Sequence, residues 1–303
     1  MNSMAQLLPR ITLVTPSLNA EKTIDRTLGS IEQQAYPNLQ VICVDGNSSD
    51  GTPAIIERYR HIVSHVIREK DRNVAEAINK GFLLGNGEIY CYLNADDVLA
   101  LGALECIARI FMDDLDIDVV TGGCRRVFAD GSEVITQVPL NYLDVLSMRN
   151  GIEQPSTFWR AAVHRRLGAL DESYQLAFDW EWWNRLHASG ARFKRITTVL
   201  STYHFSEDNL TSRGGHRVIE EMYRVTLTYG PFKGHIADVY RFLFRVFDMH
   251  GYYDKRFHDL PIAKQLLFRG TLTILYRIFG KKAINAYNWN WASKQLRGLV
   301  WYK

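Results

Sequence analysis

The chain has 303 residues, of which 47% are hydrophobic and 23% are charged, with a formal net charge of +3 at pH 7. This composition is that of a globular protein and excludes a disordered chain. The length allows one large α/β domain with a smaller appendage, or two modest domains.

Apolar, strand-like runs alternate with helical patterns over about the first 125 residues. The β-branched run Ile11–Thr15 comes first, and Asn19 after it is expected to cap a helix. Further strands are expected at Leu39–Val44, Ile62–Ile67, Glu88–Leu93 and Asp118–Gly122, and further helices after Gly51, over Val74–Leu84 and over Ala103–Met112. Strands and helices that alternate in this way predict βαβ units and a mostly parallel sheet.

The alternation fades after this point. Helices are expected at Arg160–Leu167 and Asp179–Ala188, and the apolar run Ile196–Leu200 leads to His204. From Ile236 onward the pattern is helical, aromatic and basic. The segment 232–303 holds 13 Lys/Arg and 4 Asp/Glu, a balance of +9, so the rest of the chain carries −6. Such a division of charge indicates that the two parts have different partners.

The basic segment 232–303 has two interpretations. Basic amphipathic helices with aromatic residues fit an anionic membrane surface, which predicts peripheral membrane contact. The alternative is a helical cap packed on the rest of the chain, or the interface of a homodimer. Binding to nucleic acid is not expected, because no recognisable module for it is present.

The cysteines indicate the redox compartment. Cys43, Cys91, Cys106 and Cys124 form no CxxC pair and are expected to be free thiols in a reducing compartment. The first ten residues lack the features of a signal peptide, and no apolar run is long enough for a membrane-spanning helix. We therefore expect a cytoplasmic protein, located at the inner face of the plasma membrane if the basic segment binds lipid.

Polar residues follow three of the expected strands directly, in Pro16–Asn19, Asp45–Asp50 and Asn94–Asp97. Ligands of such sheets bind outside the carboxyl ends of the strands. The two carboxylates of Asn94–Asp97 suit a hard divalent cation, either Mg²⁺ or Mn²⁺. The alternative for each acidic stretch is a polar turn, with its aspartates capping the next helix or closing the turn.

Taken together, eight stretches resemble the family 2 glycosyltransferases of the GT-A fold, from about Ile11 to about Ser212. In chain order they are Val14–Ala20, Val44–Thr52, Glu69–Arg72, Ala75–Gly81, Tyr92–Asp97, Gln154–Phe158, Gly168–Glu172 and Asp179–Leu186. The resemblance implies an α/β GT-A nucleotide-binding fold, with a mostly parallel central sheet flanked by helices and a C-terminal helical extension. It implies a catalytic domain over 1–231, with a nucleotide-sugar half over about 1–125 and an acceptor half over about 126–231, followed by the segment 232–303.

The resemblance also implies roles for individual residues of the nucleotide-sugar half. The residues expected to contact the nucleotide sugar are Thr15, Pro16, Leu18, Asp45, Asp71, Arg72, Asn94 and Asp96. Asp96 occupies the metal-ligand position of the family's DxD motif, and His204 lies where GT-A enzymes often supply a second ligand. Asn94 replaces the first aspartate of that motif and removes one charge. The expected cofactor is Mn²⁺ or Mg²⁺.

On the acceptor side, Asp179 falls where the family keeps its catalytic base. Phe178 stands where an acidic neighbour is usual, so Glu181 is the alternative base, and helix capping is the alternative role of Asp179. Gln154 and Trp180 are further acceptor-side candidates, although core packing is the alternative for any single tryptophan. The loop 206–212 is expected to close over the diphosphate.

The implied function is the inverting, metal-dependent transfer of a single sugar from a nucleotide-sugar donor to a glycan or a lipid-linked acceptor, in cell-surface polysaccharide synthesis. A UDP-sugar is the favoured donor, with GDP- and dTDP-sugars as alternatives. One rival is a catalytically silent nucleotide- or glycan-binding module on the same fold. A dinucleotide-binding oxidoreductase is disfavoured because Pro16–Asn19 contains no GxGxxG. A processive synthase is disfavoured because a QxxRW-like motif and membrane spans are not evident.

Overall fold

The computed structural model describes residues 8–205, 215–231, 235–246 and 261–280. By packing, the chain divides into two units. Unit 1 comprises 1–138, 152–178 and 185–206, and unit 2 comprises 139–151, 179–184 and 207–303. This division is based on packing, and the functional boundary expected after residue 231 stays a prediction.

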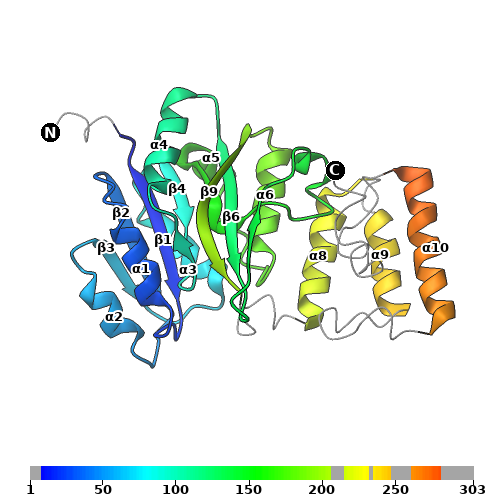
Figure 1. Ribbon diagram of the computed structural model, residues 1–303, viewed down its shortest axis with the longest axis horizontal. Helices are drawn as coiled ribbons and strands as arrows, with labels where there is room; N and C mark the ends of the chain where they lie inside the picture. Colours follow the sequence, from blue (N-terminus) through cyan, green and yellow to red (C-terminus); the bar gives the residue numbers. More distant parts are fainter. Residues whose placement is uncertain (1–7, 206–214, 232–234, 247–260, 281–303) are drawn as a thin grey trace. The chain divides into compact units, whose positions relative to one another are not determined.

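The first half of unit 1 is built from βαβ units, as the alternating pattern predicts (Figure 1). Four strands lie in the order β3-β2-β1-β4, and every neighbouring pair is parallel. The strands are β1 (Ile11–Ser17), β2 (Leu39–Asp45), β3 (Val63–Arg68) and β4 (Ile89–Tyr92), joined by α1 (Ile24–Glu32), α2 (Thr52–Arg58) and α3 (Val74–Leu83). Parallel strands end at one edge of the sheet, so their carboxyl-terminal loops share that edge.

The sheet continues with strands of mixed direction, in the order β4-β8-β6-β9-β5. Only β6 and β9 are parallel in this part, so the expectation of a mostly parallel sheet holds for the first half alone. The strands are β5 (Val98–Leu99), β6 (Val119–Val127), β8 (Thr157–Arg160) and β9 (Phe193–His204), with β7 (Glu133–Thr136) paired to β6. The intervening helices are α4 (Ala103–Asp113), η1 (Tyr142–Val145), η2 (Gln154–Ser156), α5 (Ala161–Leu167) and α6 (Phe178–Ala188). The expected α/β fold class is confirmed.

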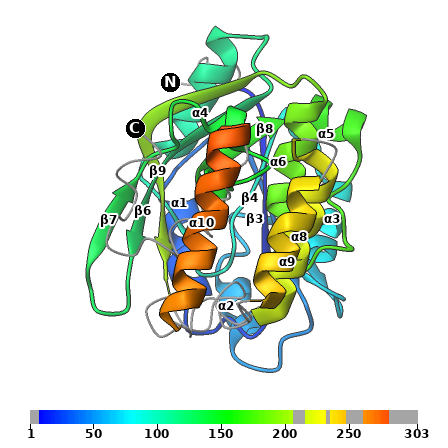
Figure 2. The same cartoon turned by 90° about the vertical axis from the view of Figure 1, so that its right-hand side faces the viewer.

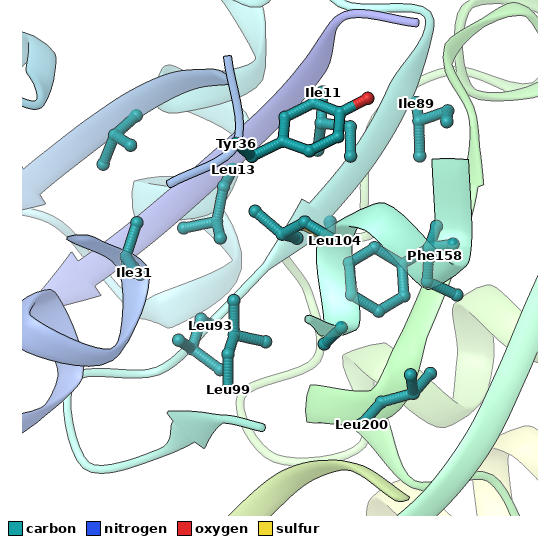
Figure 3. Close-up of a cluster of buried hydrophobic side chains, with 14 of the residues drawn as sticks. Ile11, Leu13, Ile31, Tyr36, Ile89, Leu93, Leu99, Leu104, Phe158 and Leu200 are labelled. Atoms are coloured by element: carbon teal, nitrogen blue, oxygen red, sulfur yellow. The ribbon is translucent and has the colours of Figure 1, made fainter. Parts of the chain in front are cut away.

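Alternate residues of each strand face opposite sides of the sheet, because side chains in a strand have a period of two. Ile11 and Leu13 of β1 belong to a buried cluster with Ile31 of α1 and Leu104 of α4 (Figure 3). Phe158 of β8 lies in the same cluster. Helices α1, α2 and α4 therefore share one face of the sheet with the main apolar core.

Helix α3 covers the other face, and Gly81 explains how it comes so near. A Cβ added at Gly81 would lie 2.5 Å from Cγ1 of Val14, a distance that real Cβ atoms do not adopt. On the same helix, Phe82 stacks on Tyr90 of β4 with ring centroids 4.7 Å apart. The close approach of α3 keeps the loop before it, which holds Asp71, near the ends of β1 and β2.

One expected cap is wrong. Asn19 does not cap α1, whose N-cap residue is Thr23. Instead Asn19 has a positive φ of 50°, and its side-chain oxygen accepts a hydrogen bond from the backbone N–H of Ser49 (2.9 Å). Asparagine tolerates this left-handed conformation better than most residues. The loop after β1 is thus tied to the loop after β2.

Within the described part of unit 2 there are three further helices, which Figures 1 and 2 show: α8 (Gly215–Tyr229), α9 (His235–Val246) and α10 (Ile262–Phe279). The helical pattern expected from Ile236 is confirmed where the chain is described. The loop 206–212 and the tryptophans after residue 280 lie outside the described residues. Among the helices described, none has the length and the apolar character needed to cross a membrane. All four cysteines are free thiols, as expected.

Candidate active site

The carboxyl edge of the parallel sheet gathers the polar loops of unit 1. In the strand register, Ser17 of β1 lies beside Asp45 of β2, and Asp45 lies beside Arg68 of β3. The hydroxyl oxygens of Thr15 and Ser17 are buried and have no hydrogen-bond partner among the described residues. A buried hydroxyl is stabilised by a partner, so both are suited to contact a polar ligand at this edge.

Two residues expected to meet the nucleotide, Leu18 and Asp71, come together around Gly46. A Cβ at Gly46 would lie 3.3 Å from Oδ2 of Asp71 and 3.4 Å from Cδ1 of Leu18. Leu18 is 63% exposed, which is unusual for a leucine beside buried strands. Oδ1 of Asp71 accepts a hydrogen bond from Nζ of Lys80 (2.7 Å), and this leaves Oδ2 facing Gly46. An apolar side chain and a carboxylate oxygen around a bare glycine form a surface suited to a planar base.

Asp45 is buried, and its own turn engages its carboxylate. The backbone N–H of Ser48 donates to both carboxylate oxygens (3.2 Å each), and the Ser48 hydroxyl donates as well. Nε of Arg68 lies 3.2 Å from Oδ2. The turn that the sequence offered as the alternative is therefore formed, and a nucleotide contact by Asp45 stays a prediction.

Arg72 is exposed and also has internal partners. Its side chain pairs with Glu76 (Nε–Oε2 2.9 Å) and with Glu172. Asn73 next to it caps α3, its side chain accepting from the backbone N–H of Glu76 (3.0 Å). In this arrangement Arg72 helps to fix the start of α3, and its expected contact with the donor is untested.

The loop after β4 holds the expected metal ligand. Nη2 of Arg26, on α1, donates to the backbone oxygen of Asp96 (3.1 Å), and the Thr27 hydroxyl donates to the backbone oxygen of Asp97 (2.8 Å). The amide of Asn94 donates to Oε1 of Gln154 (3.3 Å), whose own amide donates to the Tyr92 oxygen (2.8 Å). The loop is thus held from both sides, and Gln154 acts on it through Asn94.

The two carboxyl groups of this loop are buried and lie close to each other. Burial raises the pKa of Asp96, and burial together with the charge of Asp96 raises the pKa of Asp97 well above its ordinary value. Oδ1 of Asp97 is buried and has no hydrogen-bond partner among the described residues. Two crowded carboxyls of this kind are stabilised by a divalent cation. The residues present therefore fit the metal that the sequence predicts.

The structure brings His204 to the same loop, from the end of β9. Its ring hydrogen-bonds to the backbone of Asp96. Burial lowers the pKa of His204, and the nearby Arg26 lowers it further, so the ring is neutral at pH 7 and able to act as a ligand. No group of three or more His, Cys, Asp or Glu side chains suited to a metal occurs among the described residues. A cation here would take Asp96 and His204 and complete its coordination from a diphosphate.

Asp179 lies in unit 2, in the first turn of α6. The N-cap of this helix is Ala177, so the capping alternative for Asp179 is wrong. Its carboxylate accepts from the backbone N–H of Trp180 (2.6 Å) and from the Asn150 amide (3.3 Å). Burial raises the pKa of Asp179 to about 6, and the charge of Glu221 adds to that rise. A carboxylate with a pKa near the working pH is suited to take a proton.

The two neighbours of Asp179 have structural partners. Glu181 is buried, and one of its carboxylate oxygens accepts from the Tyr229 hydroxyl (2.7 Å). Trp180 is buried and its indole N–H donates to the Leu146 oxygen, which favours packing over a sugar platform. Trp182 and Trp183 are buried too. Of the two candidate bases, Asp179 is therefore better suited than Glu181.

Sequence reasoning missed four residues that lie near the candidate site residues. Arg26 contacts Asp96 from 70 positions away, and Asn150 holds Asp179. Glu153 adds negative charge near Asp97. Nη2 of Arg126 donates to both carboxylate oxygens of Glu153, at 3.0 and 3.1 Å. An arginine on an exposed helix face gives no local signal, so only the spatial arrangement reveals these contacts.

Comparison with known proteins identifies the family of the chain. The model of the family described as "Glycosyl transferase family 2" matches residues 12–163, half of the chain. TagX, named a glycosyltransferase in Staphylococcus aureus, is 29% identical over 37% of this chain and 34% of its own length. TuaG of Bacillus subtilis, named a teichuronic acid biosynthesis glycosyltransferase, is 33% identical over 35% of this chain and 43% of its own length. The chain thus matches less than half the length of these two relatives.

Solved structures agree on the fold. TarS of S. aureus, in complex with UDP-GlcNAc, has a TM-score of 0.59 at 17% identity, covering 90% of this chain and 82% of that chain. A mannosyltransferase from Pyrobaculum calidifontis, in complex with GDP-Man and Mn²⁺, has a TM-score of 0.60 at 18% identity, covering 97% and 88%. At this level of identity the likeness shows the fold alone.

Proposed function

The chain belongs to glycosyl transferase family 2, and we propose that it transfers a single sugar from a nucleotide-sugar donor to a hydroxyl of a glycan or lipid-linked acceptor, with inversion at the anomeric carbon. The observation that carries the proposal is the loop after β4. There the ring of His204 and the guanidinium of Arg26 both reach the backbone of Asp96, whose carboxyl group is buried at the carboxyl edge of the parallel strands. This combination suits a diphosphate bound through a cation.

The donor is held by the loops after β1, β2 and β3. Leu18, Gly46 and Asp71 bind the base, and the hydroxyls of Thr15 and Ser17 offer hydrogen bonds to the nucleotide. A UDP-sugar is the favoured donor, supported by the UDP-GlcNAc complex of TarS. A GDP-sugar is the first alternative, supported by the GDP-Man complex of the mannosyltransferase.

Asp96 and His204 would hold the Mn²⁺ or Mg²⁺, which when bound neutralises charge on the leaving diphosphate. The Mn²⁺ in the mannosyltransferase complex supports this choice of cofactor. Arg26 adds positive charge at the same loop, since its guanidinium reaches the backbone of Asp96. Gln154 accepts from the Asn94 amide and donates to the Tyr92 oxygen, so it ties this loop to the end of β4.

Asp179 takes the proton of the acceptor hydroxyl as that oxygen attacks the anomeric carbon. The carbon–oxygen bond to the diphosphate breaks, and the diphosphate leaves with the electron pair. Asn150 and the N–H of Trp180 orient the carboxylate. A product in cell-wall polysaccharide synthesis is supported by the name of TuaG.

The test is a donor screen followed by product analysis. Thermal shift with UDP-, GDP- and dTDP-sugars and Mn²⁺ should show one nucleotide raising the melting temperature by several degrees, since specific binding stabilises by mass action. Release of the matching nucleoside diphosphate, followed with and without chelator, then measures turnover. Binding without any hydrolysis or transfer would support the catalytically silent module instead. NMR of the product anomer checks inversion.

A further inference from the structure

Helix α10 exposes a row of aliphatic side chains that nothing in the proposed chemistry uses. Leu267, Ile274 and Ile278 are 58%, 58% and 65% exposed. With Ala263 and Gly270, which are exposed too, they recur at spacings of three and four and so form one face of the helix. We call this row the apolar face of α10. Phe268, Leu272 and Leu275 form a different stripe, which is buried.

Basic side chains flank the apolar face. At 3.6 residues per turn, Lys264 lies on one side of it and Arg277 on the other, and both are exposed. The 18 residues of α10 include no Asp or Glu. An acidic protein partner would find only a few basic side chains beside a mainly aliphatic face. An anionic membrane matches both the aliphatic face, through its acyl chains, and the basic side chains, through its phosphates.

The hydroxyl groups of the helix do not oppose burial in lipid. The Thr271 hydroxyl donates to the Leu267 backbone oxygen (2.9 Å), and the Thr273 hydroxyl donates to the Arg269 backbone oxygen (2.8 Å). Both hydroxyls therefore keep a partner when water is removed, which lowers the cost of placing them in an apolar region. Gly270 has open space around its Cα, so the face is free of local crowding.

We propose that α10 lies in the surface of an anionic membrane, with its apolar face among the acyl chains and Lys264 and Arg277 on lipid phosphates. The helix does not span the membrane, because the described chain holds no helix of sufficient length and apolar character. The proposal is independent of sugar transfer. It also sharpens the peripheral contact expected for 232–303, by naming the helix and the face that make it.

The experiment compares vesicle binding of the full chain with that of two matched triple variants. Leu267→Gln, Ile274→Gln and Ile278→Gln are combined to remove the apolar face. The control combines Leu83→Gln, Leu101→Gln and Leu115→Gln, three unit 1 leucines that are 85%, 82% and 77% exposed. Vesicles of phosphatidylglycerol and phosphatidylcholine are sedimented with each protein, beside vesicles of phosphatidylcholine alone.

We expect the wild-type chain to bind the anionic vesicles and the α10 variant to bind on the order of tenfold more weakly or worse. The unit 1 control should bind like the wild type. Lys264→Gln with Arg277→Gln should weaken binding by roughly fivefold per charge, an effect that salt should mimic. Equal binding by the wild type and the α10 variant overturns the proposal, as does a wild type that ignores anionic vesicles.

A labelled variant guards against loss of folding. Ile274→Cys carrying an environment-sensitive dye should shift its emission to the blue with anionic vesicles, while the same dye at Leu83→Cys should not. Ultracentrifugation without lipid tests whether a second copy of the chain covers the apolar face of α10. A wild-type dimer that the α10 variant converts to monomer, together with no vesicle binding, would assign the apolar face to a second copy of the chain.

Discussion

Two carboxylates with raised pKa values stand in contrasting surroundings. Asp96 lies in a unit 1 loop beside Asp97, with Arg26 and the neutral ring of His204 at its backbone. Asp179 lies in unit 2, where its carboxylate accepts from the Asn150 amide and a backbone N–H and lies near the charge of Glu221. The first setting offers ligands and positive charge, whereas the second holds the carboxylate by two hydrogen bonds and adds the negative charge of Glu221. Burial alone therefore does not assign a role, and the neighbours are what favour the proposed metal role for Asp96 and the proposed base role for Asp179.

The sharpest way to break this comparison is Asp179→Asn. The amide keeps the shape of the side chain but cannot accept the proton, so turnover should fall roughly 10²- to 10⁴-fold. Nucleotide binding should stay within a few-fold of the wild type by thermal shift. Glu181→Gln is the matched control, because Glu181 is engaged by Tyr229, and it should keep most of its activity. Normal turnover by Asp179→Asn would remove the base assignment.

Asp96→Asn tests the other side of the comparison. Loss of the carboxylate should weaken Mn²⁺ binding in the presence of nucleotide by roughly tenfold or more, since a charged hard ligand is lost. Electron paramagnetic resonance of free Mn²⁺ measures this without any turnover. Asp25→Asn, at an exposed residue of α1 paired with Arg58, serves as the control. Unchanged Mn²⁺ affinity in the Asp96 variant would contradict the metal role.

The pH dependence of turnover should follow Asp179. With a pKa raised to about 6, the carboxylate is ionised at pH 8 and mostly protonated at pH 5. The rate constant kcat/KM should then be level above pH 7 and lie roughly tenfold lower at pH 5. A profile that stays flat down to pH 5 would place the essential base elsewhere.

The smallest effect concerns stability. Because the folded pKa of Asp179 is raised, the ionised carboxylate disfavours the folded state above about pH 6, and this disadvantage fades as the pH falls toward the unfolded value near 3.8. Asp179→Asn should therefore raise the melting temperature at pH 8 and give no gain at pH 4. Melting curves by circular dichroism at the two pH values measure the difference, with Glu181→Gln as the comparison. A gain that is equal at both pH values would point to packing in place of charge.

Much of the fold of unit 1 follows from the sequence by itself. The β-branched run Ile11–Thr15 predicts a strand that is buried on both faces, and the 3.6-residue spacing over Val74–Leu84 predicts a helix that buries its apolar residues on one side. Asp96 directly follows the strand-like run Glu88–Leu93, so the sequence also predicts that it lies at the carboxyl edge of the sheet. The local prediction that fails is the helix cap at Asn19. Its side chain accepts a hydrogen bond from Ser49, 30 positions away, and does not cap the helix that follows it.

Partners far apart in the sequence were decided only by the tertiary structure. The turn around Asp45 could be predicted from the sequence. The ion pair of Asp45 with Arg68 could not, because it depends on the register of β2 and β3. His204 reaches Asp96 because β9 pairs with β5, the strand that follows the Asp96 loop, and Arg26 arrives there on α1. Local patterns specify elements through short-range sterics and burial, whereas the neighbours of a carboxylate depend on how those elements pack. The sequence therefore named Asp96 and Asp179, and packing determined the surroundings that distinguish their chemistry.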